Sequence, residues 1–272
     1  MTLCAVWKHE NTLHLASDSR VNLGAAGRAD IAIKIGREHY SIYAPYDRNF
    51  EKVEIASGDL AFCYAGSGLG AIFMKESLSD ILNELQIVPG EHEASLSSVV
   101  KVVFEAYKVI SIKLAEILQS LAFVHLIVAG FCRHSNCFRA FQMLPIPFDS
   151  SASSIQEYQM EEVLVGNSNY LFFGSGKGEA EKEFQKQYED GLSLRIIRTF
   201  KNIIKNNLRD DVGGSLQYGR FEQGVFKTFA EKENDTESQA GVRCRRGALD
   251  MRAPELERLF SFEYPWVILD EI

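Results

Sequence analysis

The order of apolar patterns along the chain constrains its fold more than any other feature. Strand-like segments come first, then two helical segments, then strands, two more helical segments and further strands. The helical periods run over 74–85 and 100–117, and then over 184–188 and 192–204. Each helix pair is amphipathic enough to cover one face of a sheet. The order predicts an α+β protein, specifically a four-layer αββα sandwich with two antiparallel sheets between helix layers.

Three residues with complementary chemistry lie at regular intervals in the first predicted strands. Thr2 precedes the strand 3–7, Asp18 follows the strand 12–17, and Lys34 lies in the strand 31–35. Asp18 lies 16 positions after Thr2, and Lys34 lies 16 positions after Asp18. We expect the two later strands to flank the first, so that all three side chains meet.

Thr2 would carry a free amine next to its hydroxyl if Met1 were removed, and its small side chain suits that removal. An α-amino group has a reference pKa of about 7.7–8.0, so a fraction is neutral at pH 7 and can act as base for the hydroxyl. Lys34 would lower the pKa of the amine and stabilise the alkoxide, and Asp18 would hold Lys34. This combination predicts a threonine nucleophile for amide hydrolysis.

The segments Thr2-Leu3-Cys4-Ala5-Val6, Leu15-Ala16-Ser17-Asp18-Ser19-Arg20 and Ala32-Ile33-Lys34-Ile35 resemble the opening of proteasome β-subunits, which are N-terminal nucleophile (Ntn) hydrolases. The lack of a propeptide is similar to bacterial HslV, whereas the long C-terminal tail is more similar to the Anbu group of bacterial homologues. Both alternatives stay open at this stage.

The resemblance also implies further site residues. Gly66, in the pair Ala65-Gly66 between a strand and a helix, corresponds to the family's oxyanion donor. Ser175, in Gly174-Ser175-Gly176, corresponds to a serine near the terminal amine. The family's later Asp-x-x-Ser-Gly element is imperfect here, because 210–214 reads Asp-Asp-Val-Gly-Gly.

The resemblance implies a threonine-type endopeptidase in a self-compartmentalising homo-oligomer of rings or stacked rings. Its substrate would be a peptide or unfolded protein, with an ATP-dependent unfoldase as a candidate partner. Two alternatives are a catalytically silent proteasome-like scaffold subunit and an Ntn amidohydrolase of a small-molecule amide.

Three other motifs are weaker. The pattern Gly66-x-Gly68-x-x-Ala71 suits a dinucleotide loop, but a second helix follows where a βαβ unit needs a strand. The stretch 174–178 lacks the first glycine and the Ser or Thr of a phosphate loop. Cys132, His134 and Cys137 offer metal ligands without a second Cys/His pair at finger spacing. We therefore expect neither cofactor nor metal.

Composition sets the remaining expectations. A net charge of -8 and a pI of about 5.4 disfavour nucleic acid and anionic membranes as partners. The five cysteines are odd in number and scattered, and the longest apolar stretch, 121–131, is too short to span a bilayer. We expect a cytoplasmic protein with an Ntn-hydrolase domain over 1–229. Residues 230–272 would form a polar linker and an extension docking on the core or on a neighbouring subunit.

Overall fold

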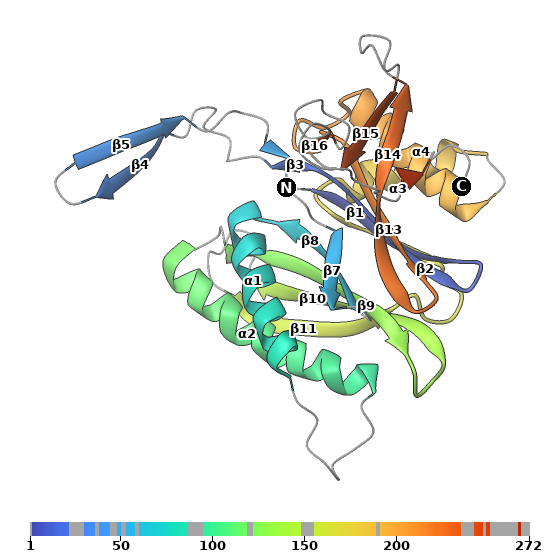
Figure 1. The fold of residues 1–272 in the computed structure, drawn as a ribbon, viewed down its shortest axis with the longest axis horizontal. Coiled ribbons are helices and arrows are strands. Elements are labelled where there is room, and N and C mark those ends of the chain that lie inside the picture. Colours follow the sequence, from blue (N-terminus) through green and yellow to red (C-terminus); the bar gives the residue numbers. More distant parts are fainter. Residues whose placement is uncertain are drawn as a thin grey trace, which may run out of the picture.

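The computed structural model describes residues 2–21, 30–35, 38–43, 48–49, 53–57, 60–85, 95–118, 122–147, 155–188, 191–234, 242–246, 249–250 and 266–267. Within these segments the strands form two large sheets, and four helices lie outside them, as Figure 1 shows. One helix pair, α1 and α2, lies on the opposite side of the sheets from the other pair, α3 and α4.

The larger sheet has the order β12-β1-β2-β13-β14-β15-β16, with β17 joined to β14. All of its pairs are antiparallel except β14 with β17. Its strands are β1 (Leu3–His9), β2 (Thr12–Asp18), β12 (Tyr170–Gly174), β13 (Leu216–Glu222), β14 (Val225–Asn234), β15 (Val242–Arg246), β16 (Leu249–Asp250) and β17 (Trp266–Val267).

The smaller sheet is antiparallel throughout and has the order β11-β10-β9-β8-β7. Its strands are β7 (Val53–Ser57), β8 (Leu60–Gly66), β9 (Val124–Cys132), β10 (Cys137–Pro147) and β11 (Ile155–Val163). The helices are α1 (Gly68–Glu84), α2 (Leu96–Leu118), α3 (Lys177–Lys186) and α4 (Leu192–Lys205).

Three apolar clusters correspond to the three interfaces of a four-layer sandwich. The first joins α1 and α2 to β8, β9 and β10, and the second joins α3 and α4 to β1, β12 and β13. The third lies between the sheets, where alternate residues of β1, such as Cys4 and Val6, meet Ala61 and Cys63 of β8. The αββα architecture predicted from the order of elements is therefore confirmed.

The helix faces agree with the periodicity of the sequence. On α4, Ile196, Ile197, Phe200 and Ile203 are fully buried against the larger sheet. Burial of each such side chain contributes about 1.5–3 kcal/mol to folding. This apolar stripe fixes α4 on the sheet beneath the segment 206–215 that enters the site.

The strand that carries Lys34 does not flank β1, contrary to expectation. β1 lies between β2 and β12, whereas β4 (Asp30–Ile35) pairs with β5 (Glu38–Tyr43) as a hairpin that Figure 1 draws apart from the large sheets. A second small pair joins β3 (Arg20–Val21) to β6 (Arg48–Asn49). β12 suits the place beside β1 because Phe172 enters the helix-side core and Phe173 enters the core between the sheets.

Strands also occur inside the segment predicted as a linker. β14 runs through the proposed boundary at residue 229 and ends at Asn234, and β15 and β17 pair with it. The segment 231–234 is polar and charged and lacks apolar alternation, so the sequence pattern does not predict a strand there. The division into a domain over 1–229 and an extension over 230–272 stays a prediction.

Candidate active site

Asp18 ties the end of β2 to two other backbone segments. Its side chain is fully buried, and Oδ1 accepts a hydrogen bond from the Leu3 amide at 2.9 Å. Oδ2 accepts from the amides of Gly213 at 3.1 Å and Arg20 at 3.3 Å. A buried carboxylate needs such donors, and hydrogen bonds to a charged acceptor are the stronger kind. Asp18 thus fixes the start of β1 against the loop before β13.

The backbone of Thr2 is held on both sides of its α-carbon. Thr2 is 2% exposed, and its nitrogen donates to Ser175 Oγ at 3.0 Å. Its carbonyl oxygen accepts from the Gly176 amide at 3.3 Å and from the Ser175 hydroxyl at 3.4 Å. Two atoms of Thr2 therefore meet the turn between β12 and α3 that the sequence singled out.

Gly174 allows this close approach. Its φ is +89°, and a Cβ at this position would lie 2.2 Å from the Thr2 carbonyl oxygen. Both the backbone conformation and the space exclude a side chain. A glycine at the end of β12 is thus required for Ser175 to reach the Thr2 nitrogen.

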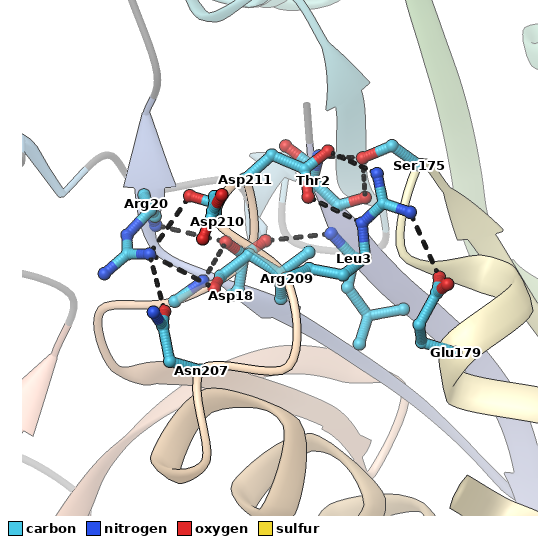
Figure 2. Close-up of polar contacts among 12 residues, drawn as sticks. Thr2, Leu3, Asp18, Arg20, Ser175, Glu179, Asn207, Arg209, Asp210 and Asp211 are labelled. Carbon is cyan, nitrogen blue, oxygen red and sulfur yellow. Dashed lines mark hydrogen bonds and ion pairs between the residues drawn. The ribbon is translucent and has the colours of Figure 1, made fainter. Parts of the chain in front are cut away.

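Asp211 lies behind Ser175 and is 5% exposed. Arg209 donates to it through Nε at 2.7 Å and Nη2 at 2.9 Å, and reaches Glu179 on α3 through Nη1 at 3.2 Å. Hydrogen bonding from Arg209 lowers the pKa of Asp211 against the opposing effect of burial, and a hydrogen bond from Ser175 lowers it further. Figure 2 shows Asp211, Ser175 and Thr2 side by side, with Arg209 leading to Glu179.

Arg20 holds the same loop from the other side. Its Nη1 donates to Asn207 Oδ1 and to the Asp210 carbonyl, both at 3.1 Å, and to the Val212 carbonyl at 3.5 Å. The Gly213 carbonyl accepts from the Arg20 amide at 3.0 Å. A Cβ at Gly213 would lie 2.5 Å from the guanidinium carbon, so another residue there would displace the Arg20 side chain.

Gly66 ends β8 on the opposite sheet and turns the chain into α1. Its φ is +125°, and a Cβ would lie 2.3 Å from the Phe123 carbonyl oxygen. The next residue, Ser67, caps α1 by accepting from the Gly70 amide at 3.2 Å, a bond of about 1 kcal/mol in such positions. A Cβ at Gly174 would lie 3.2 Å from the Ala65 Cβ, so the end of β8 approaches the strand that faces Thr2.

Solved structures share the fold over most of the chain. Anbu, the ancestral beta-subunit from Yersinia bercovieri, superposes with a TM-score of 0.55 at 12% identity, covering 94% of this chain and 90% of that one. A mutant form of Anbu from Hyphomicrobium sp. strain MC1 has a TM-score of 0.57 at 13% identity, covering 88% and 90%. A second Hyphomicrobium Anbu structure has a TM-score of 0.54 at 13% identity, covering 83% and 86%.

The fold is the Anbu-like Ntn fold. Neither a family model nor a curated protein matches the sequence. The likeness is therefore one of three-dimensional structure, and it bears out the resemblance to proteasome β-subunits that the opening segments indicate.

Within this Anbu-like fold the structure brings together four of the five predicted site residues to different degrees. The Asp18 carboxylate accepts from the amide of Leu3, the first residue of β1, and the Ser175 hydroxyl accepts from the nitrogen of Thr2, the residue before it. Gly66 lies near these residues because its neighbour Ala65 is close to Gly174. The side chain of Lys34 lies outside the described residues. The catalytic roles of Thr2, Asp18, Lys34, Gly66 and Ser175 stay predictions.

Sequence reasoning missed the pair Arg209 and Asp211 beside Ser175. The signal was the imperfect Asp-x-x-Ser-Gly element, because its acidic residue is present at 210 and 211 although its serine is not. The buried member, Asp211, is the one that reaches Ser175. In this chain a buried carboxylate thus lies next to Ser175, although the serine of the Asp-x-x-Ser-Gly element is absent.

In chemical terms, the Thr2 backbone nitrogen, the Ser175 hydroxyl and the buried Asp211 carboxylate lie in a row, and this set can hold and move a proton once the nitrogen is a free amine. Among the described residues, no group of three His, Cys, Asp or Glu side chains has the arrangement of a metal site. None of the described helices has the length and apolar character needed to cross a membrane.

Proposed function

We propose that this chain is a threonine-type peptidase whose nucleophile is Thr2, freed by processing after Met1. The observation that carries the proposal is the 3.0 Å hydrogen bond from the Thr2 nitrogen to Ser175 Oγ. In the processed chain this nitrogen is the α-amine, which is the base that the mechanism needs. The Ser175 hydroxyl, which also contacts Asp211, is hydrogen-bonded to this nitrogen, and the nitrogen has to accept and return the proton.

In the proposed reaction the Thr2 amine takes the hydroxyl proton as Oγ attacks the substrate carbonyl carbon. The resulting oxyanion collapses, the C–N bond breaks, and the ammonium returns its proton to the leaving nitrogen. An ester links the acyl group to Thr2. Water, deprotonated by the same amine, then hydrolyses the ester and releases the acid.

The other predicted residues have supporting roles in this proposal. The Gly66 amide would stabilise the oxyanion, and the approach of Ala65 to Gly174 supports its nearness. Asp18 would fix the Thr2 backbone through the Leu3 amide. Lys34 would lower the pKa of the amine, a role that rests on its spacing from Thr2 and Asp18 in the sequence.

We further propose a self-compartmentalising homo-oligomer that acts on peptides or unfolded proteins in the cytoplasm, with an ATP-dependent unfoldase as candidate partner. Exposed apolar side chains on the outer surface of α2 support an assembly surface, since Val109, Ile112 and Ile117 are 60%, 48% and 76% exposed. Size-exclusion chromatography with light scattering tests this point separately from catalysis, and a monomer at micromolar concentration would contradict it.

A peptidase assay on Thr2 variants tests the catalytic proposal. Thr2→Ala should lower peptide hydrolysis by more than about 1,000-fold, because the reaction loses its nucleophile. Thr2→Ser retains a hydroxyl and should keep a measurable fraction of the activity. Equal activity of wild type and Thr2→Ala, at equal helix content, would remove Thr2 from the mechanism.

Two other functions would appear in the same assay. A catalytically silent proteasome-like scaffold is favoured by the Gly213-Gly214 pair where the family has a serine, and it predicts no turnover by any variant. An Ntn amidohydrolase predicts Thr2-dependent turnover of small amides without cleavage of peptides. A panel that combines both substrate classes distinguishes the three.

A further inference from the structure

Two cysteines face each other where β9 and β10 join. Cys132 ends β9 and Cys137 begins β10, and their α-carbons are direct partners in the antiparallel ladder. Such partners lie about 4.5–5.5 Å apart, within the range of about 4.4–6.8 Å that disulfides span. Both are free thiols. The pair lies at the far end of β9 from Val124, which pairs with Gly66.

The two thiols differ in their access to solvent. Cys132 is 1% exposed and packs in the cluster that joins α1 and α2 to the smaller sheet. Cys137 is exposed. Because direct cross-strand partners point to the same face, the two thiols lie side by side, and only that of Cys137 is open to solvent. A reagent from solvent therefore meets Cys137 first.

Ser135, in the turn 133–136, connects the two sulfurs. Its hydroxyl lies 3.2 Å from Cys137 Sγ and also forms a hydrogen bond with Cys132. One hydroxyl group can contact both sulfurs only when they are close together. The pairing in the ladder and this shared contact are independent indications of that nearness.

Cys132 is surrounded by hydrogen-bond donors. Burial raises its pKa, but the Ser135 hydroxyl and the backbone amides of Ser135, Leu96 and His134 outweigh burial and bring the pKa to about 7. Leu96 is the first residue of α2, so the positive end of a 23-residue helix faces the sulfur. Roughly half of Cys132 is then ionised at pH 7, about 15-fold more than for a thiol with the ordinary pKa of about 8.5.

Arg139 adds a cation on the same face of β10 as Cys137, two residues further along. Its guanidinium binds Glu162 through Nε at 2.8 Å and contacts the Ser97 hydroxyl in the first turn of α2. The hydrogen bond to Glu162 is the main cause that raises the pKa of Arg139, and Cys132 adds a hydrogen bond and a charge interaction. The thiolate of Cys132 is thus paired with a fixed positive charge.

We propose that Cys132 and Cys137 form a redox-active thiol pair that reacts with low-molecular-weight disulfides and closes to a disulfide across the β9–β10 hairpin. The inference does not depend on the proposed peptidase activity, because the pair lies away from Thr2 and its readout is covalent. Among the described residues no third ligand completes a metal site with these cysteines, so thiol chemistry suits the pair better than metal binding.

The reaction has two balanced exchange steps. The Cys137 thiolate first attacks one sulfur of the external disulfide, forms a mixed disulfide and releases one thiolate, which takes up the proton that Cys137 lost. The Cys132 thiolate then attacks Cys137 Sγ and displaces the second small thiol, which takes up the proton from Cys132. The two cysteines are oxidised, and one external disulfide is reduced to two thiols.

Mass mapping of the full-length protein after incubation with oxidised glutathione tests the proposal. The wild type should lose two hydrogens, retain no glutathione, and yield a linked peptide that contains Cys132 and Cys137. Cys132→Ser should instead retain one glutathione on Cys137, because nothing displaces it. Cys137→Ser should react at least tenfold more slowly, because the buried thiol is hard to reach.

Cys63→Ala is the matched control, since it removes a buried thiol in the core between the sheets, and it should react as the wild type does. Glutathione retained on wild-type Cys137, a disulfide with a different cysteine, or no reaction would each overturn the proposal. The wild-type map decides the matter even where a serine variant fails to fold.

The pH dependence of the closing step identifies the attacking thiol. After acid quenching and alkylation, the wild-type closure rate should level off above about pH 7, the pKa of Cys132. Arg139→Gln should move this plateau to higher pH, because the thiolate loses its nearby cation. A wild-type rate that keeps rising through pH 8.5 would contradict attack by Cys132.

Discussion

The Asp18 carboxylate accepts the amide hydrogen of Leu3 at 2.9 Å across 15 positions of sequence. This bond places the residue after Thr2 against a buried charge, and it holds the start of β1 where Ser175 can reach the Thr2 nitrogen. Because Asp18 also accepts from Gly213, one side chain joins the N-terminal strand, β2 and the loop before β13.

Asp18→Asn should destabilise the fold by about 1–3 kcal/mol. The amide group presents a donor to backbone amides that need an acceptor, which leaves buried donors unpaired. Urea unfolding followed by circular dichroism measures the effect. Glu116→Gln, on the exposed surface of α2, is the control and should change stability by less than about 0.5 kcal/mol. Equal stability of both variants would remove Asp18 as the organiser of this region.

If Ser175 and Asp211 assist proton transfer at the Thr2 amine, Ser175→Ala and Asp211→Asn should each lower peptide hydrolysis by roughly 100- to 1,000-fold. The double variant should lose little more than either single one, because the two act as a unit. Ser168→Ala, which removes an exposed hydroxyl near the start of β12, serves as control. Full activity of Ser175→Ala would refute the role.

Lys34→Ala should lower kcat by more than about 100-fold with little change in stability, if Lys34 provides the cation that the Thr2 amine requires. Arg209 is another cation near Ser175. Arg209→Gln breaks its pair with Asp211 and should lower stability as well, which distinguishes its role from that of Lys34. Lys182→Ala on α3 is the control. Retained activity in Lys34→Ala with loss in Arg209→Gln would transfer the role to Arg209.

Acid should weaken the fold through two histidines, the buried His14 and the partly buried His125. Burial lowers the pKa of His14 to about 3 and that of His125 to about 4, whereas both are near 6.5 when unfolded. Below pH 6.5 the unfolded chain therefore binds protons that the folded chain does not. Each histidine should lower the free energy of unfolding by up to about 1.4 kcal/mol per pH unit in this range.

Urea unfolding between pH 6.5 and 5 measures this slope, above the range in which carboxylates titrate. His14→Gln should remove roughly half of it while also losing the contact between His14 Nδ1 and the Tyr218 hydroxyl at 2.8 Å. Ser168→Ala, which removes an exposed hydroxyl and no titratable group in this range, should leave the slope unchanged. A wild-type stability that is flat over this range would contradict the neutral state of both histidines in the folded protein.

The order of elements was readable from the sequence because each layer has its own period. The apolar repeat of α4 and the alternation in β1 directly specify which faces are buried. The turn at Gly174 was also recognisable, because Gly174-Ser175-Gly176 resembles a motif of proteasome β-subunits.

Long-range pairing was less readable. The choice of β12 over β4 as partner of β1 depends on Phe172 and Phe173 filling two different cores, which only the assembled sandwich specifies. The importance of Asp211 over Asp210 likewise depends on which carboxylate is buried against Arg209 and Ser175. Local pattern alone carries no information on either point.

The mass of the purified full-length protein, before and after treatment with a threonine-directed electrophile, tests the central claim most directly. The purified chain should lack one methionine and gain one adduct, mapped to Thr2 and absent from Thr2→Ala. A chain that keeps Met1 and gains no adduct would contradict the claim that Thr2 supplies both nucleophile and base.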